Sequence, residues 1–302
     1  METLFSFVTE PLAHDFMQRA LLMSVLVSVV CSVFSCFLVL KGWSLMGDAV
    51  SHAILPGLAF AYLLSIPLAI GAFFSGLFCA VAVGFLKQNS RVKEDAVMGI
   101  VFSGMFAFGL VVFTKIETEL HLLHVLFGNV LGITPRDMAE AGVIAVVCTV
   151  IMLAKRRDLS LHCFDPVHAS VVGLPVRLLH FGFLILLALT IVAALKAVGI
   201  ILVVAMLVAP GAIGLLLART FDGMLMVAVC ASLFSCVTGV LVSYHLDTAT
   251  APLIVVIEAL LFAVPVLMAK VPAFRKRRSA QRPQALVTDL CATPQRPDKI
   301  NG

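Results

Sequence analysis

Long apolar runs of about twenty residues alternate with short polar connections along most of the chain. A helix needs about 20 mostly apolar residues to cross the hydrocarbon core of a bilayer. Nine runs reach this length, or eight, because 178 to 218 is nearly continuous and is broken only around Lys196 to Gly199. They lie near residues 20–40, 44–64, 67–86, 96–114, 137–154, 178–195, 198–218, 223–244 and 252–269. The pattern predicts an all-α, polytopic transmembrane helical bundle with eight or nine spans.

The segments between and beyond these runs set the expected domain organisation. We expect an N-terminal segment over 1–18, a transmembrane domain over 19–270 and a disordered cytoplasmic tail over 271–302, because that tail has little to bury. The run 120–132 is apolar but too short to span, which favours a re-entrant or interfacial helix. The longest polar connection, about 155–177, is considered separately below.

Composition agrees with a membrane-embedded fold. Hydrophobic residues make up 61% of the 302 residues and charged residues 13%, against about 45–50% and 25% in soluble domains. The net charge of +4 is modest, so it indicates membrane topology rather than binding to nucleic acid.

The positions of the basic residues predict the orientation. All four basic groups fall on one side of the membrane if there are nine spans, and positive loops stay in the cytoplasm. We therefore predict an outside N-terminus and a cytoplasmic C-terminus. The groups are Lys87, Arg91 and Lys93; Lys155, Arg156, Arg157 and Arg177; Arg219; and Arg275, Lys276, Arg277 and Arg278.

Asp48 and His52 are the polar pair that stands out, because they lie inside an apolar run where lipid-facing helices carry neither residue type. Residues four apart project from the same face of a helix, about one turn from each other. Ionisable groups in a span cost free energy and usually face a bundle interior or a water-filled path. The pair is therefore a hypothesis for a functional site.

Pro56 is expected to break its helix, since it has no N–H to donate to the carbonyl of His52 four residues earlier, and that carbonyl is a possible third ligand. A carboxylate, an imidazole and a backbone carbonyl suit a divalent first-row metal such as manganese, iron or zinc. The same groups can instead relay protons, or the pair can be a hydrogen bond between packed helices.

Two further features of the spans are weaker candidates. Glu258 lies inside an apolar run without a basic neighbour in sequence, so it joins a metal path, pairs with Lys196, or is a neutral acid between helices. Pro210 is expected to break its span and to free the carbonyl of Met206. Broken helices expose backbone oxygens to substrates, although a packing kink is the other explanation.

The connection 155–177 carries a pattern that a plain linker lacks. Asp165 to Pro175 can form a short helix with Ala169 and Gly173 on one face, ended by Gly173 and Pro175. A short surface helix with small residues predicts a docking site for another protein. A helix lying on the membrane surface is the alternative.

Catalytic motifs are missing from the sequence. It contains no GxxxxGK[ST] phosphate loop, so ATP hydrolysis has to come from a separate chain. It also lacks a GxSxG elbow and an HExxH pair. We therefore expect a transport subunit rather than an enzyme. His121, His124, His245 and Asp247 lie on the predicted outer side, where they either meet an arriving cation or are ordinary loop residues.

Several passages together resemble the permease subunits of bacterial ABC importers for manganese, iron and zinc. Nearly all of residues 15–270 are similar, most closely to permeases of chelated iron and manganese systems. The passages are LKGWSLMGDAVSHAILPG, VKEDAVMGIVFSGMFAFGL, LFGNVLG, FDPVHASVVGLPV and VGIILVVAMLVAPGAIGLLLA. The tail after Lys270 matches nothing in the family pattern.

This resemblance implies partners and roles. It implies a cytoplasmic dimer of ATP-binding subunits, a second permease that is a copy or a sibling of this chain, an extracytoplasmic metal-binding protein, and the lipid of the bacterial inner membrane. The family's metal-handling pair falls on Asp48 and His52, and its ATPase-docking loop on Asp165, Ala169, Gly173 and Pro175. No cofactor is bound permanently, because the divalent metal is the cargo. The main alternatives are a zinc importer of this family and a proton-coupled metal carrier.

Overall fold

The computed structural model describes residues 10–11, 13–115 and 135–270, and all regular secondary structure in these residues is helical. One compact unit extends to Phe262, and the last turns of the final helix, from Ala263, belong to a second unit. The long helices are α2 (Asp15–Lys41), α3 (Met46–Leu63), α4 (Leu68–Asn89), α5 (Glu94–Phe113), α7 (Pro135–Ala154), α10 (Val176–Val198), α11 (Ile200–Leu217), α12 (Phe221–Leu246) and α13 (Thr250–Lys270). Two short helices, α8 (Arg156–Phe164) and α9 (Pro166–Val171), lie between α7 and α10.

These helices confirm the predicted all-α transmembrane bundle. Within the described residues, eight helices are long and apolar enough to cross a membrane by length and composition. The ninth long helix, α3, carries Asp48 and His52 and falls outside that group of eight. The predicted short helix over 120–132 and the tail over 271–302 lie outside the described residues.

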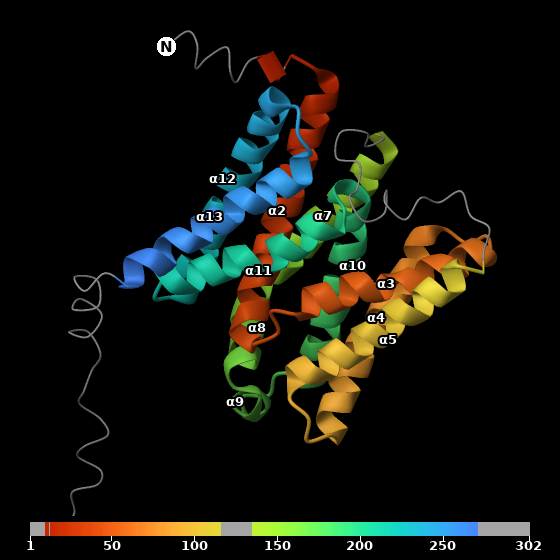
Figure 1. Cartoon of the computed structure of the whole chain (residues 1–302). Helices are drawn as coiled ribbons and strands as arrows, with labels where there is room; N and C mark the ends of the chain where they lie inside the picture. The colour runs from red at the N-terminus through yellow and green to blue at the C-terminus, as the bar shows by residue number, and fades with distance from the viewer. Residues whose placement is uncertain (1–9, 12, 116–134, 271–302) are drawn as a thin grey trace, which may run out of the picture. The chain divides into compact units, whose positions relative to one another are not determined.

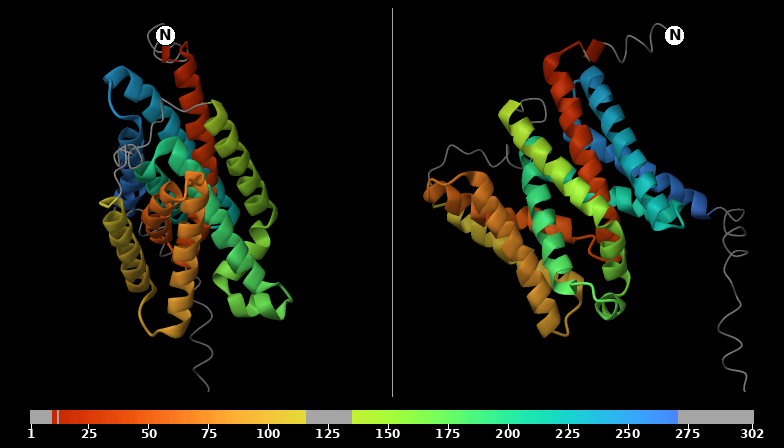
Figure 2. Two further views of the ribbon diagram at one scale, coloured as in Figure 1. Left: turned by 90° about the vertical axis from the view of Figure 1, so that its right-hand side faces the viewer. Right: turned by 180° about the vertical axis from the view of Figure 1, so that it is seen from behind.

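Helix α2 lies at the centre of the first unit and packs against α7, α11 and α12 (Figures 1 and 2). Ser24, Ser28, Ser32 and Ser35 recur along this helix at intervals of three and four residues, and all are buried. Small side chains at this spacing let neighbouring helices approach closely. Their hydroxyls are partly satisfied by backbone carbonyls, as in the bond from Ser32 Oγ to Val29 O at 2.9 Å.

Two glycines with positive φ separate long helices. Gly42 ends α2 with φ 74°, and the chain reaches α3 within a few residues. Gly199 has φ 82° and divides α10 from α11, where the sequence predicted a break around Lys196 to Gly199. Only glycine adopts such conformations at low cost, so these positions fix where each helix ends.

Helix α3 packs against α4 and α5, and the three lie together in Figure 1. The outward side of α4 carries exposed aromatic residues, among them Phe74, Phe78 and Phe85. An exposed face of this kind is stable in hydrocarbon and costly in water. The arrangement places α3 among membrane-embedded neighbours despite its two ionisable residues.

Candidate metal site and docking segment

Asp48 and His52 lie side by side on α3. His52 Nε2 is 3.2 Å from Asp48 Oδ1, and the two side chains are 29% and 30% exposed. The imidazole contacts two rings of α5, with centroid distances of 6.0 Å to Phe102 and 5.4 Å to Phe106. The predicted one-face geometry is therefore present, and the pair is reachable from outside the chain.

Close backbone contacts hold α3 in place around this pair. A Cβ added to Gly57 of α3 would collide with the carbonyl oxygen of Gly71 on α4, and the reverse is equally true. Ser75 Oγ of α4 donates to Ala53 O at 2.6 Å. Helix α5 approaches as closely, since a Cβ on Gly109 would lie 2.7 Å from Pro56 N. These contacts fix the helix that presents the pair.

Pro56 does not break its helix. Helix α3 continues from Met46 to Leu63 through this buried proline, because the surrounding glycines accept its ring at close range. The local effect is confined to the missing donor for the His52 carbonyl. The predicted break is therefore wrong, while a role for that carbonyl stays a prediction.

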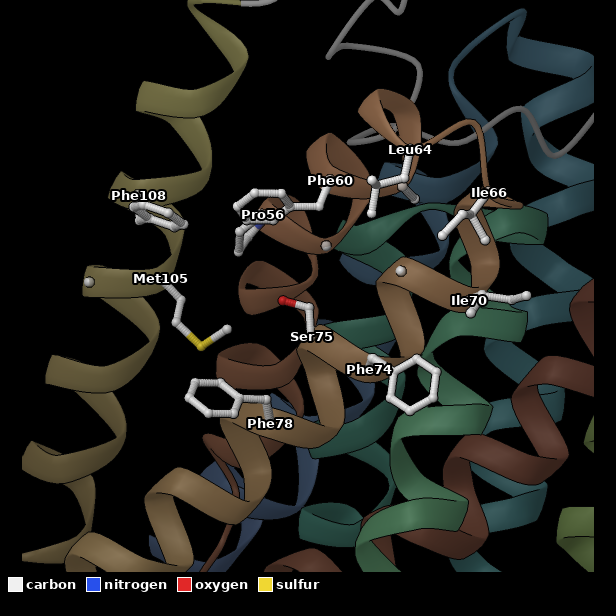
Figure 3. Close-up of a pocket in the computed structure, with 14 residues that line it drawn as sticks. Pro56, Phe60, Leu64, Ile66, Ile70, Phe74, Ser75, Phe78, Met105 and Phe108 are labelled. Carbon is white, nitrogen blue, oxygen red and sulfur yellow. The ribbon is translucent and has the colours of Figure 1, made fainter.

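An apolar pocket of about 560 Å³ opens one turn beyond His52, between α3, α4 and α5 (Figure 3). Pro56 and Phe60 of α3 face it together with Met105 and Phe108 of α5. Its lining residues include no His, Cys, Asp or Glu. The pocket therefore offers a divalent metal no carboxylate, imidazole or thiolate side chain.

Pro210 also lies inside an unbroken helix, because α11 runs from Ile200 to Leu217. The neighbouring backbone is satisfied by α2: Gly211 N donates to Ser35 Oγ at 2.8 Å, and Ser35 Oγ lies 3.2 Å from Val208 O. The expected break in the span is therefore wrong. A role for the carbonyl of Met206 stays a prediction.

Glu258 is 1% exposed on α13, and neither carboxyl oxygen has a hydrogen-bond partner among the described residues. Lys196, its predicted partner, instead lies 3.8 Å from Asp137 and 3.6 Å from Glu140 on α7. Within the described ranges, no three His, Cys, Asp or Glu side chains converge to hold a metal. Glu258 therefore does not complete a three-residue site with Asp48 and His52.

Residues 165–175, called the docking segment below, contain the short helix that the sequence predicted. Asp165 caps α9 by accepting from Val167 N at 3.0 Å and His168 N at 2.9 Å. Gly173 follows the helix with φ 86°, and Pro175 immediately precedes α10. α9 is thus a short, capped helix between the short α8 and the long α10.

The exposed face of this segment differs from the expected one. Ala169 is 0% exposed, so it cannot contact a partner directly. Large apolar side chains project instead, with Val171 78% exposed and Phe164, Val167 and Val172 also on the surface. Ala169 is small because it packs inward, and the residues available for docking are the valines around it.

The three histidines and the aspartate predicted on the outer side fall in different parts of the chain. His121 and His124 lie outside the described residues. His245 is in the last turn of α12, and Asp247 ends that helix in the left-handed conformation with φ 48°. Sequence reasoning missed a cluster of rings formed by Trp43, His162 and His180. A tryptophan that occurs once in the chain, placed just before the helix of the pair, was the available signal.

Comparison with known proteins identifies the family. Residues 13–269 match the model of the ABC 3 transport family. The chain belongs to this family. Members of known name include the chelated iron transport system membrane protein YfeD of Yersinia pestis, which is 56% identical over 95% of this chain and 96% of its own length. The manganese transport system membrane protein MntB of Synechocystis is 50% identical over 86% of this chain and 85% of its own length.

The solved structures support the same placement. A chain from PsaBC of Streptococcus pneumoniae, solved in complex with a Fab, superposes with a TM-score of 0.80 at 31% identity. The match covers 91% of this chain and 99% of that one. The resemblance to metal ABC importer permeases is thus confirmed for this ABC 3 family member, as is its character as a multi-pass membrane protein.

Proposed function

We propose that this ABC 3 family chain is the permease subunit of an ATP-binding-cassette importer that carries manganese or iron across the bacterial inner membrane into the cytoplasm. One observation carries the proposal: a carboxylate and an imidazole, 3.2 Å apart and about one-third exposed, lie on a helix among membrane-embedded neighbours. Oxygen and nitrogen ligands of these types suit divalent first-row metals. The relatives named for iron and manganese transport agree with this cargo.

The pair supplies only part of a coordination shell, since no third His, Cys, Asp or Glu joins it among the described residues. A transport site has to release its ion as well as bind it, so incomplete coordination is an advantage. We propose that the equivalent pair of a second permease, a copy or a sibling, faces this one and completes the site. Binding between two chains then makes affinity depend on how closely the chains approach.

The energy source in this proposal is a separate dimer of ATP-binding subunits. The valines exposed around α9 and the capped geometry of that helix support docking on the cytoplasmic side. An extracytoplasmic metal-binding protein delivers the ion on the opposite side. We propose a cytoplasmic C-terminus, which the positions of the basic residues support.

Uptake of radioactive manganese, iron and zinc into metal-starved cells tests the proposal, with the cognate ATPase and binding protein co-expressed. Asp48→Asn removes the carboxylate charge and His52→Gln removes the imidazole nitrogens, while both keep the approximate side-chain size, and we expect each to abolish uptake. Asp15→Asn and His14→Gln make the same chemical changes at the start of α2 and should leave uptake intact. Normal uptake of all three metals in the Asp48 and His52 variants would refute the site.

A further inference from the structure

Three aromatic rings link the start of α3 to α8, the helix that leads into the docking segment. Trp43 lies in the connection before α3, and its ring meets the edge of His180 of α10 with a centroid distance of 5.5 Å. His180 in turn meets the edge of His162 of α8 at 6.1 Å. We call Trp43, His180 and His162 the ring junction.

The tryptophan end of the ring junction is fixed tightly. Trp43 is buried, with Lys41 Nζ 3.8 Å from its ring centroid and Lys87 Nζ 5.7 Å away. An ammonium over an indole face is attractive because of the ring quadrupole. Lys41 Nζ also lies 3.3 Å from His180 Nδ1. A displacement of His180 is therefore passed to the indole rather than absorbed by loose packing.

Trp43 is joined to α3 through the backbone. Its N–H donates to Leu38 O at 2.8 Å, and its carbonyl accepts from Met46 N, the first residue of α3, at 2.9 Å. Asp48 follows two residues later on the same helix. Movement of the indole thus acts on the first turn of the helix that carries the metal-binding pair.

His162, at the other end of the ring junction, has no hydrogen bond from the described part of the chain to hold its ring and is held by packing. His162 is buried, and neither ring nitrogen has a hydrogen-bond partner among the described residues. Its helix ends at Phe164, directly before Asp165, which caps α9. A ring without a fixed hydrogen bond can shift when its helix shifts. α8 also packs against α10, so a push on the docking segment reaches His180 through this contact.

We propose that the ring junction couples the ATPase-docking segment to the metal-binding helix, so that displacement of α8 and α9 moves Asp48 and His52. The inference rests on the proposed function, because it needs an ATPase at α9 and a metal at α3. Trp43, His162 and His180 are positioning residues in it, since none of them touches the metal. His162 acts by its planar bulk, because neither of its ring nitrogens has a hydrogen-bond partner among the described residues, so a phenyl ring at this position preserves the coupling.

The test uses the whole complex, with both permeases, the ATPase dimer and the binding protein, reconstituted in proteoliposomes. Manganese is supplied outside the vesicles. ATP hydrolysis and manganese uptake are measured on the same sample, and their ratio reports coupling. We expect His162→Ala and His180→Ala to lower the manganese carried per ATP by about tenfold, a typical size for coupling between sites. His162→Phe should stay within about twofold of wild type. His14→Ala and His14→Phe, at the start of α2, are matched controls.

The outcomes separate the possible failures. Unchanged manganese carried per ATP in both alanine variants overturns the ring junction while leaving the proposed function intact. Equal losses in the alanine and phenylalanine variants, with the ATPase no longer bound, show a purely structural role and also overturn it. If the wild-type complex hydrolyses ATP but carries no metal, the proposed function fails and the ring junction fails with it.

Discussion

Ser35 of α2 and Gly211 of α11 are in close contact, next to Pro210. Gly211 N donates to Ser35 Oγ at 2.8 Å, and a Cβ on Gly211 would lie 2.5 Å from Ser35 O. The proline is tolerated in the middle of a span because a neighbouring serine accepts from the adjacent N–H. The contact leaves no space for a larger residue at position 211.

We therefore predict that Gly211→Ala destabilises the protein by about 1–3 kcal/mol, the usual cost of overpacking a filled interior. The atoms it would meet belong to the backbone of α2 and cannot rotate away. Thermal unfolding in detergent measures the change. Gly182→Ala in α10 is the control, since an added Cβ there meets nothing within 4 Å. Equal melting temperatures of the two variants would contradict the close packing inferred at Gly211.

The prolines show where sequence reasoning stops. Hydrophobic run length predicted the long helices and the break near Gly199, because burial in a bilayer imposes length and apolarity on every span. Pro56 and Pro210 were expected to break their helices, since a proline removes one hydrogen bond. Whether the helix then breaks depends on neighbours such as Gly109 and Ser35. Those neighbours are distant in sequence and invisible to a local pattern.

The candidate site was predictable to a similar degree. Spacing alone placed Asp48 beside His52, because residues four apart share a helix face. The inward direction of Ala169 was not predictable, since a six-residue helix has too few turns to show a buried face. Contacts between Trp43 and the two histidines join separate helices, and no local spacing encodes them.

The docking segment offers a test that distinguishes surface from interior. Val171→Asp places a charge on the exposed face of α9 and should weaken ATPase binding by about tenfold or more, equivalent to about 1.4 kcal/mol. The permease itself should stay folded, since Val171 is on the surface. Co-purification of the ATPase with tagged permease gives the measurement.

Ala169→Asp is the comparison variant, because the same charge then has to be buried. We expect it to lower the melting temperature of the permease as well as ATPase binding. If Val171→Asp leaves ATPase binding unchanged, the exposed valines are not the docking surface.

Acid pH should loosen the attachment of α8. Burial, and then the charge of Lys41, lower the pKa of His162 below its usual value. The surrounding titratable groups, Lys41, Lys87 and His180, lie on α2, α4 and α10, and Cys163 follows on α8 itself. An unfolded chain therefore binds this proton at about pH 6.5, before the folded chain does.

The contribution of neutral, buried His162 to the free energy of unfolding is therefore full above about pH 6.5. It is lost as the pH falls below that value towards the lowered pKa of the folded state. We predict that the melting temperature of the wild type drops between about pH 7 and pH 5, and that His162→Gln reduces this drop. The fluorescence of Trp43, the single tryptophan of the chain, reports the same change locally. Identical pH profiles for wild type and His162→Gln would show that this proton does not affect folding.

Two substitutions of Glu258 distinguish a transport role of its carboxyl group from a packing role of its side chain. Its carboxyl oxygens are buried without a hydrogen-bond partner among the described residues, and a charge in a membrane span without a counter-ion is costly. The neutral amide of Glu258→Gln therefore fits the same space, and we predict normal metal uptake and a stability change below about 1.5 kcal/mol. Glu258→Ala leaves a cavity and should cost about 2 kcal/mol or more. Loss of uptake in a stable Glu258→Gln protein would instead require an ionisable group at this position, as a proton-coupled carrier does.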